Sequence, residues 1–268
     1  MSKICLITGN HPRHKHFAKT LISTGKVCSW VIEKREKFVP LPPIGLQEDL
    51  RILFKHHFNE RNKVESEIFS SSIKAEEEVS IPIYNVIQND LNSDQTVDFV
   101  RGNSPSLVIS YGCHKLNKNL MKAVAVRFWN THGGLSPEYR GVTTHFWPSY
   151  FLEPQMTGMT LHETTNSLDA GEIIFQTAAP MVNGDTLHRL AARNVQVLSE
   201  QLASKLTKLD FDNLPKGKVQ QGYGKVFMSK DWRPEHLRVI YETHKDAIVD
   251  LVINGVIQGR EPELISVL

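Results

Sequence analysis

The first part of the chain alternates short apolar runs with amphipathic stretches. Lys3 to Thr8 and Val27 to Glu33 are apolar runs of strand length, and both are expected to be buried strands. Between them, Phe17 to Thr24 has the character of a helix. A strand, a loop, a helix and a second strand in this order begin an open, largely parallel sheet. The pattern therefore predicts an α/β fold in which such a sheet is flanked by helices.

The same alternation continues over most of the chain. After the loop Pro40-Leu41-Pro42-Pro43, Gln47 to Phe69 has helical periodicity, with an apolar side and many charges. This helix either covers a substrate pocket or is an ordinary surface helix packed on the sheet. The change in pattern predicts one main domain over residues 1–205 and a small C-terminal extension over 206–268. Further elements are expected as strands over Ile81 to Val86, Leu107 to Tyr111 and Ala123 to Phe128, the end of a short helix over Thr96 to Arg101, and a long helix over Thr186 to Leu206.

The extension carries weaker signals of its own. Gly217 to Phe227 has strand and turn signals, and Trp232-Arg233-Pro234 is expected to open a helix that reaches His244. Asn254-Gly255 stands between two short apolar runs, a combination typical of a tight turn between strands. The sequence therefore predicts a β-hairpin within the extension.

Length and composition limit the kind of protein. The 268 residues, 40% of them hydrophobic, suffice for one large core with a small appendage. The apolar runs are too short to span a membrane, and the N-terminus enters a strand directly without a signal peptide, so we expect a cytoplasmic protein. A net charge of +2 with both signs interspersed gives no reason to expect nucleic acid. Cys5, Cys28 and Cys113 lack close paired spacing and are expected to be free thiols.

Twelve histidines raise the question of a metal site. The densest groups are His11-Pro12-Arg13-His14-Lys15-His16 and His56-His57. Neither group has the neighbouring carboxylate or thiolate ligands of a dedicated metal site, and Arg13 and Lys15 would repel a cation. No metal is expected.

Polar side chains with catalytic chemistry follow the strand that reaches Phe128. Asn130 and His132 are two residues apart in an extended segment, so both side chains point to the same side. They leave the strand end at which open α/β sheets bind ligands. An amide can stabilise negative charge on a carbonyl oxygen, and an imidazole can give or take a proton near neutral pH. Asp169, brought back by the fold, could hold the imidazole in one tautomer and favour its protonated form.

Each of these residues also has a purely structural reading. Asn130 could bond the local backbone before a turn, and Asp169 could cap the turn at Ala170-Gly171. Taken together, the amide, the imidazole and the carboxylate suit acyl transfer. The chain has no G-x-S-x-G motif, and none of its cysteines stands in a catalytic context. The nucleophile is therefore expected to be the acceptor substrate itself.

Four short motifs occur in order between Leu107 and Gln176. They are Asn130-x-His132, the turn Leu135-Ser136-Pro137-Glu138-Tyr139-Arg140-Gly141, Gly158-x-Thr160-x-His162 and Leu168-Asp169-Ala170-Gly171. Together they resemble the N10-formyltetrahydrofolate-dependent formyltransferase family; the first hundred residues resemble it only in outline. The resemblance implies an open, mostly parallel Rossmann-like sheet and N10-formyltetrahydrofolate as the formyl donor. It also implies that Asn130, His132 and Asp169 are the catalytic set.

The same resemblance implies where the folate lies. Where the family usually has Ser-Leu-Leu-Pro, this chain has Gly134-Leu135-Ser136-Pro137, so only backbone contacts are expected at Gly134. The residues expected beside the folate are Gly112, Cys113, His114, Lys115 and Leu116 in one loop, and Gly134, Leu135, Ser136 and Pro137 in the other.

The resemblance also bears on the acceptor amine. The turn from Gly9 to His14 lacks the Gly-Ser-Asn phosphate turn of formyltransferases that act on phosphoribosylglycinamide. Arg13, His14 and Lys15 could instead meet the diphosphate of a nucleotide-linked sugar, or form only a solvated basic turn. The tail is shorter than the C-terminal module of methionyl-tRNA formyltransferases. It resembles the extensions of sugar N-formyltransferases, some of which use them to dimerise.

The expected function is thus the N-formylation of a nucleotide-linked amino sugar, with a homodimer as one option. Three alternatives stay open at this point. The acceptor could be a tRNA-linked amine or a small metabolite. The protein could bind folate without turnover, or it could pass the formyl group to water and release formate.

Overall fold

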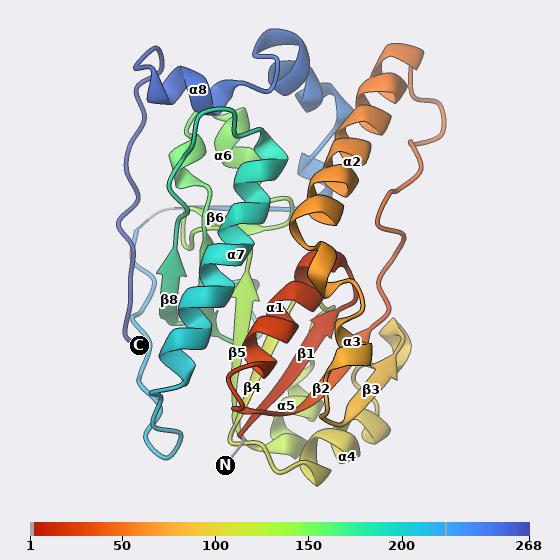
Figure 1. The fold of residues 1–268 in the computed structure, drawn as a ribbon, viewed down its shortest axis with the longest axis vertical. Coiled ribbons are helices and arrows are strands. Elements are labelled where there is room, and N and C mark those ends of the chain that lie inside the picture. Colours follow the sequence, from red (N-terminus) through yellow and green to blue (C-terminus); the bar gives the residue numbers. More distant parts are fainter. Residues whose placement is uncertain (1–2, 223) are drawn as a thin grey trace.

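The computed structural model describes residues 3–222 and 224–268 and is built around a seven-stranded sheet (Figure 1). The strand order is β3-β2-β1-β4-β5-β7-β8. The first five of these strands are parallel, whereas β7 and β8 are antiparallel to their neighbours. The predicted open, mostly parallel α/β sheet is therefore confirmed. The strands are β1 (Ile4–Gly9), β2 (Val27–Glu33), β3 (Ile83–Val86), β4 (Leu107–Tyr111), β5 (Arg127–His132), β7 (Met159–Glu163) and β8 (Ile173–Thr177).

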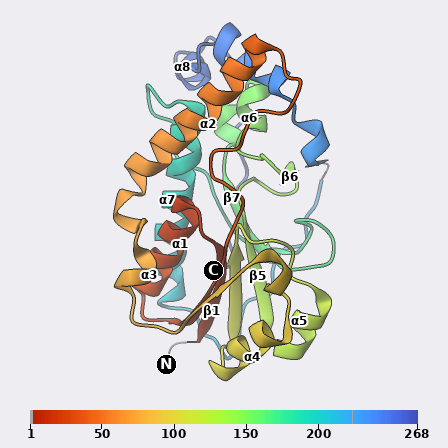
Figure 2. The ribbon, with the colours of Figure 1, turned by 90° about the vertical axis from the view of Figure 1, so that its right-hand side faces the viewer.

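Helices cover both faces of the sheet (Figure 2). On one face lie α1 (Pro12–Ile22), α2 (Glu48–Ile68) and α7 (Leu187–Leu206); on the other lie α4 (Asp94–Gly102) and α5 (Lys118–Val124). The long helix α7 begins as predicted because the Thr186 side chain accepts a hydrogen bond from the backbone of Arg189. The apolar stripe of α7 packs into the core beneath the sheet. Two separate hydrophobic cores, one on each face, hold the strands in place.

Shorter elements connect the main strands and helices. The strands β6 (Tyr139–Gly141) and β9 (Lys225–Phe227) form a small parallel pair. The short helices are α3 (Ala75–Glu78), α6 (Trp147–Tyr150) and α8 (Ile248–Ile253), and single 3₁₀ or π turns occupy Ser70–Ser72, Gln88–Asp90, Pro154–Met156, Ser229–Asp231, Pro234–His236 and Val239–Thr243. None of the helices in the described part of the chain is long and apolar enough to cross a bilayer.

The predicted β-hairpin in the C-terminal extension is wrong. Ile248–Ile253 is the helix α8, and Asn254 follows it as the C-cap. Gly255 adopts a φ of 71° and donates its amide to the backbone oxygen of Val252. A glycine with positive φ ends a helix as readily as it forms a tight hairpin turn, so the Asn-Gly signal fits both structures.

Other expectations for the extension hold only in part. The stretch from 217 to 227 contains the three-residue strand β9, and Lys218 forms an isolated bridge with Ile173. The helix expected from Trp232-Arg233-Pro234 to His244 is present as an uninterrupted helical run over 234–243, which begins as a 3₁₀ turn at Pro234–His236 and ends as a π turn at Val239–Thr243.

The extension is packed closely against the rest of the molecule. The last residues run beside β8 (Figure 1), where Ser266 bridges Phe175 and the amide of Val267 donates to Ile174. Further along the extension, the hydroxyl of Tyr241 lies 2.8 Å from Nδ1 of His57 on α2. The extension therefore contributes directly to the packing around α2.

Candidate active site

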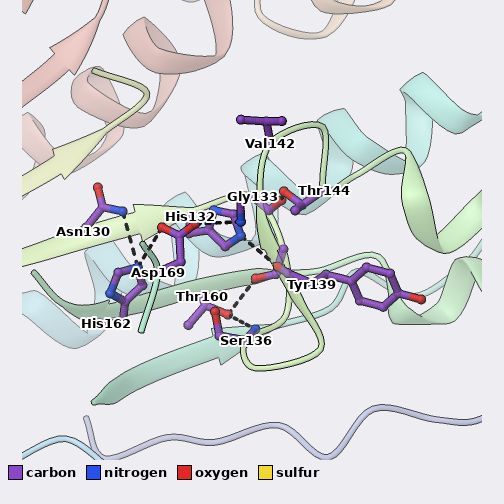
Figure 3. A network of polar contacts seen from close by, with 12 residues as sticks. Asn130, His132, Gly133, Ser136, Tyr139, Val142, Thr144, Thr160, His162 and Asp169 are labelled. Atoms are coloured by element: carbon purple, nitrogen blue, oxygen red, sulfur yellow. Dashed lines mark hydrogen bonds and ion pairs between the residues drawn. The ribbon is translucent and has the colours of Figure 1, made fainter. Parts of the chain in front are cut away.

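The amide of Asn130 lies near the carboxyl end of β5, where a small polar network fixes its orientation (Figure 3). Ser110 on the neighbouring β4 donates its hydroxyl hydrogen to Oδ1 of Asn130 over 2.9 Å. His162 is opposite Asn130 in the register of β5 with β7, and its Nε2 lies 3.4 Å from Nδ2 of Asn130. Nδ1 of His162 lies 2.8 Å from the backbone oxygen of Glu163, which fixes the orientation of the ring. The second hydrogen on Nδ2 of Asn130 is left for a substrate oxygen.

The ring of His132 is buried and is held at both nitrogens (Figure 3). Nε2 donates to the backbone oxygen of Tyr139 over 2.9 Å, and Nδ1 lies 3.4 Å from Oδ2 of Asp169. Burial lowers the pKa of His132 below its usual value, although the carboxylate of Asp169 acts in the opposite direction. Asp169 thus favours the protonated ring as expected, but burial outweighs it. The ring of the free protein is therefore mainly neutral at pH 7.

Asp169 comes from the loop between β7 and β8, with a left-handed backbone φ of 47° that aspartate tolerates better than most residues. Its Oδ2 accepts a hydrogen bond from the amide of Gly141 over 2.9 Å, and its Oδ1 lies 3.5 Å from Nε2 of His162. Burial alone would raise the pKa of Asp169. The rings of His132 and His162 and the amide of Gly141 outweigh burial and lower this pKa to about 2. Asp169 is therefore a carboxylate at neutral pH.

A cavity of about 670 Å³ opens beside these three side chains. Asn130, His132 and Asp169 all line it, so the fold brings these three side chains to one cavity; their catalytic role stays a prediction. The loop that follows β4 lines the same cavity with each of its predicted folate-binding residues: Gly112, Cys113, His114, Lys115 and Leu116.

The loop after β4 is anchored from inside the sheet by Glu33, the last residue of β2. Glu33 is fully buried. Its Oε2 accepts the backbone amide hydrogen of His114 over 2.7 Å, and its Oε1 lies 2.5 Å from Nδ1 of the same histidine. Arg35 also contacts the His114 ring and lies 3.5 Å from Oε2 of Glu33. Such charge-assisted hydrogen bonds fix the course of the loop where it lines the cavity.

The second predicted folate-binding segment, Gly134 to Pro137, is not among the residues that line the cavity. Leu135 and Ser136 are buried behind it. A Cβ atom on Gly134 would lie 2.7 Å from Nε2 of His132 and 2.4 Å from the backbone oxygen of Tyr139. The glycine that departs from the family pattern therefore leaves room for the His132 ring and its hydrogen bond. Contact between this segment and the folate stays a prediction.

Two residues of the network were not predicted as site residues. His162 was noted only as the end of the motif Gly158-x-Thr160-x-His162, and Ser110 was not noted at all. The signal for Ser110 was its polarity within the otherwise apolar strand β4. For His162, the available signal was a histidine within a run of strand character.

The other side of the cavity is formed by α1, α2 and α7. Arg13 and His14 line it, whereas Lys15 does not and pairs with Glu76 over 2.6 Å. Several side chains of α2 also line the cavity, so this helix covers a pocket in addition to packing on α7. Within residues 3–222 and 224–268, no cluster of three or more potential metal ligands occurs.

The family model described as formyl transferase matches residues 56–206, which is more than half of the chain. This chain belongs to the formyl transferase family. The match includes all three predicted catalytic positions and the loop from Gly112 to Leu116.

Solved structures of formyltransferases share the fold. A sugar N-formyltransferase from Shewanella sp FDAARGOS_354 is 19% identical, with a TM-score of 0.54 over 85% of this chain and 78% of that one. Phosphoribosylglycinamide formyltransferase from Anaplasma phagocytophilum is also 19% identical, with a TM-score of 0.53 over 85% of this chain and 98% of that one. A 4-N formyltransferase from Francisella tularensis is 15% identical, with a TM-score of 0.51 over 86% of this chain and 78% of that one.

Formyltransferases of this type use N10-formyltetrahydrofolate as the formyl donor. The side chains of this formyl transferase fit such a donor. The cavity has the size of a small-molecule site. The loop from Gly112 to Leu116 and the side chains of Asn130, His132 and Asp169 line the same cavity, so a donor along the loop would have its formyl group within the same space as these side chains.

Proposed function

We propose that this formyl transferase moves the formyl group of N10-formyltetrahydrofolate to a primary amine of a nucleotide-linked amino sugar and so produces an N-formylated sugar. The observation that carries the proposal is the meeting of Asn130, His132 and Asp169 in one cavity with a donor loop on one side and arginines on the other. The chain offers no activated serine or cysteine at this place, which leaves the attack to the amine of the acceptor.

Asn130 has the clearest role in the proposed reaction. The donor supplies an electrophilic formyl carbon, and negative charge develops on the formyl oxygen when the amine attacks. The free N–H of Asn130 can donate to that oxygen, because Ser110 and His162 already hold the amide in place. An amide that is oriented in advance does not need to reorganise as the charge develops.

His132 is proposed to carry the proton. When the reactants displace the Tyr139 oxygen, a neutral ring with its hydrogen on Nδ1, directed to Asp169, can accept the proton of the attacking amine at Nε2, and the 3.4 Å contact with Asp169 then becomes an ion pair. The protonated ring can pass the proton to the departing folate nitrogen. In the free protein Nε2 of His132 is bonded to the oxygen of Tyr139, so this bond has to be exchanged for a substrate or a water when the reactants bind.

The test is the release of tetrahydrofolate from N10-formyltetrahydrofolate across a panel of nucleotide-linked amino sugars, with product detection by mass. The His132→Ala variant serves as the inactive control, and its thermal unfolding confirms that it is folded. Acceptor-dependent release that is lost in the variant supports the proposal. Donor binding without release for any acceptor contradicts it and favours a folate-binding protein, while formate without an acceptor indicates hydrolysis.

The division at residue 205 and dimerisation through the extension are also part of this proposal. The extension packs on β8 and on α2, which supports a role in completing the main domain. Size-exclusion chromatography with light scattering tests the dimer directly.

A further inference from the structure

One arm of the cavity holds a half-buried positive charge that has no direct ion pair among the described residues. Arg61 on α2 lines this arm, and its Nε is buried without a hydrogen-bond partner among the described residues. Within the described ranges, no carboxylate oxygen lies within 4 Å of a nitrogen of Arg61. One terminal nitrogen donates to the backbone oxygen of Phe38. Burying such a charge is costly unless a ligand compensates for it.

Two aromatic rings hold the guanidinium of Arg61 in place. Its central carbon lies 4.5 Å from the centroid of Phe38 and 4.7 Å from that of Phe58. Arg13 approaches the same Phe38 ring at 5.7 Å, so the two guanidinium groups are neighbours. Arg13 is paired with Glu65 over 2.8 Å, whereas Arg61 has no such pair. Arg61 is therefore the arginine of this arm without a direct ion pair among the described residues, although the carboxylates of Glu36 and Glu65 line the same cavity.

Neutral histidines complete the arm. His188 on α7 is 5% exposed, and its Nε2 has no hydrogen-bond partner among the described residues. Its ring centroid lies 4.5 Å from that of His57, which also lines the cavity. Burial and the charge of Arg61 lower the pKa of His188 to about 3, so the ring is neutral and can donate to an anion without adding charge.

The usual anion position of such folds, the turn after β1, is blocked in this protein. The ring of His14 fills the space between the ends of β1 and β4. A Cβ atom on Gly9 would lie 2.4 Å from Nδ1 of His14, and one on Gly112 would lie 2.1 Å from its Nε2. A phosphate cannot lie against this turn while the ring is there. Arg61 lines the cavity from α2 and does not belong to this turn.

We propose that Arg61, assisted by Arg13 and His188, binds the diphosphate of the acceptor in the arm between α1, α2 and α7. This inference rests on the proposed function, in which the acceptor is a nucleotide-linked amino sugar. Arg13, Arg61 and His188 line the same cavity as His145 and His132. The arm is thus continuous with the catalytic end of the cavity, as a donor and an acceptor in one reaction require.

Inorganic pyrophosphate tests the anion site without the need for turnover. Isothermal titration should show binding to the wild type that weakens about 10- to 100-fold in Arg61→Met. The matched control is Arg51→Met, since Arg51 is on the same helix, pairs with Glu48 and does not line the cavity. This control should bind like the wild type. Equal binding by wild type and Arg61→Met overturns the proposal.

A second variant, Arg61→Lys, provides a test if Arg61→Met does not fold. Arg61→Lys keeps the charge but loses the planar fork, and it should bind pyrophosphate with an affinity between those of wild type and Arg61→Met. If Arg61→Met fails to fold, the comparison of Arg61→Lys with the wild type decides. An unchanged affinity in the folded lysine variant then contradicts the proposal.

Kinetics separate this proposal from the proposed function. In Arg61→Met the KM for the nucleotide-linked amino sugar should rise about 10-fold or more, while the KM for the formyl donor stays unchanged. An active wild type with no change of acceptor KM in Arg61→Met overturns the anion site alone. A wild type that formylates no nucleotide-linked amino sugar overturns the proposed function, and the pyrophosphate titration still reports on the anion site.

Discussion

Replacing Gly134 with alanine tests whether this glycine makes room for the catalytic ring. The new Cβ would lie 2.4 Å from the oxygen of Tyr139 and 2.7 Å from Nε2 of His132, where ordinary contacts begin near 3.4 Å. The neighbours must move by up to about 1 Å, and a displacement of that size at a catalytic group can cost about 100-fold in rate. Overpacking of this kind also lowers the free energy of unfolding by about 1–3 kcal/mol.

The assay is the rate of tetrahydrofolate release at saturating donor and acceptor, together with the midpoint of thermal unfolding. Gly102→Ala is the matched control, because a Cβ there meets nothing within 4 Å and Gly102 lies far from β5 in the sequence. Gly134→Ser, which restores the serine expected from the family pattern, should behave like Gly134→Ala or worse. Full activity and an unchanged midpoint in Gly134→Ala would refute the steric argument.

Three further changes probe the network and its charges. Ser110→Ala should lower kcat about 5- to 10-fold at constant KM for the donor, because Asn130 loses a hydrogen bond worth about 1 kcal/mol; an unchanged kcat would rule out this positioning role. Glu33→Gln should raise the KM for the donor about 10-fold and leave kcat nearly constant, because the backbone amide of His114 loses its charged acceptor. A roughly 10-fold lower kcat with an unchanged KM for the donor would contradict this reasoning. Acidification from pH 6.5 to about 4 should destabilise the fold, because burial lowers the pKa of His145 from 6.5 to about 4 and only the unfolded chain gains a proton in that range. The loss from this one ring is roughly 3 kcal/mol, and a urea midpoint that does not fall between pH 7 and pH 5, or falls equally in His145→Gln, would count against it.

Local sequence patterns predicted most of the sheet and its main helices. The strands β1, β2 and β4 are short apolar runs, and such runs are buried on both faces in a parallel sheet. The helices α2 and α7 were predicted from their periodicity to within two residues of their bounds. These features depend on residues that are close in sequence, which is why one chain is enough to predict them.

Features set by distant partners were not predicted. The pairing of Asn130 with His162 depends on the antiparallel register of β5 and β7, which residue spacing does not determine. Burial lowers the pKa of His132 by more than Asp169 raises it, and burial depends on the whole fold. The Asn254-Gly255 pair was misread because the same dipeptide can end a helix or turn a hairpin, and packing around α8 decides between them.

The contact between Tyr241 and His57 makes the last quarter of the chain an outer support of the cavity, because His57 lines the cavity and Tyr241 does not. Asp246, in the same segment, accepts a hydrogen bond from the backbone amide of Leu187 at the start of α7. Both α2 and α7, which carry the basic arm, are therefore hydrogen-bonded to residues beyond position 205. Selectivity for the acceptor can therefore change through substitutions in the extension while every strand of the sheet stays as it is. A chimera that exchanges only this segment between relatives would transfer preference for an acceptor without touching Asn130, His132 or Asp169.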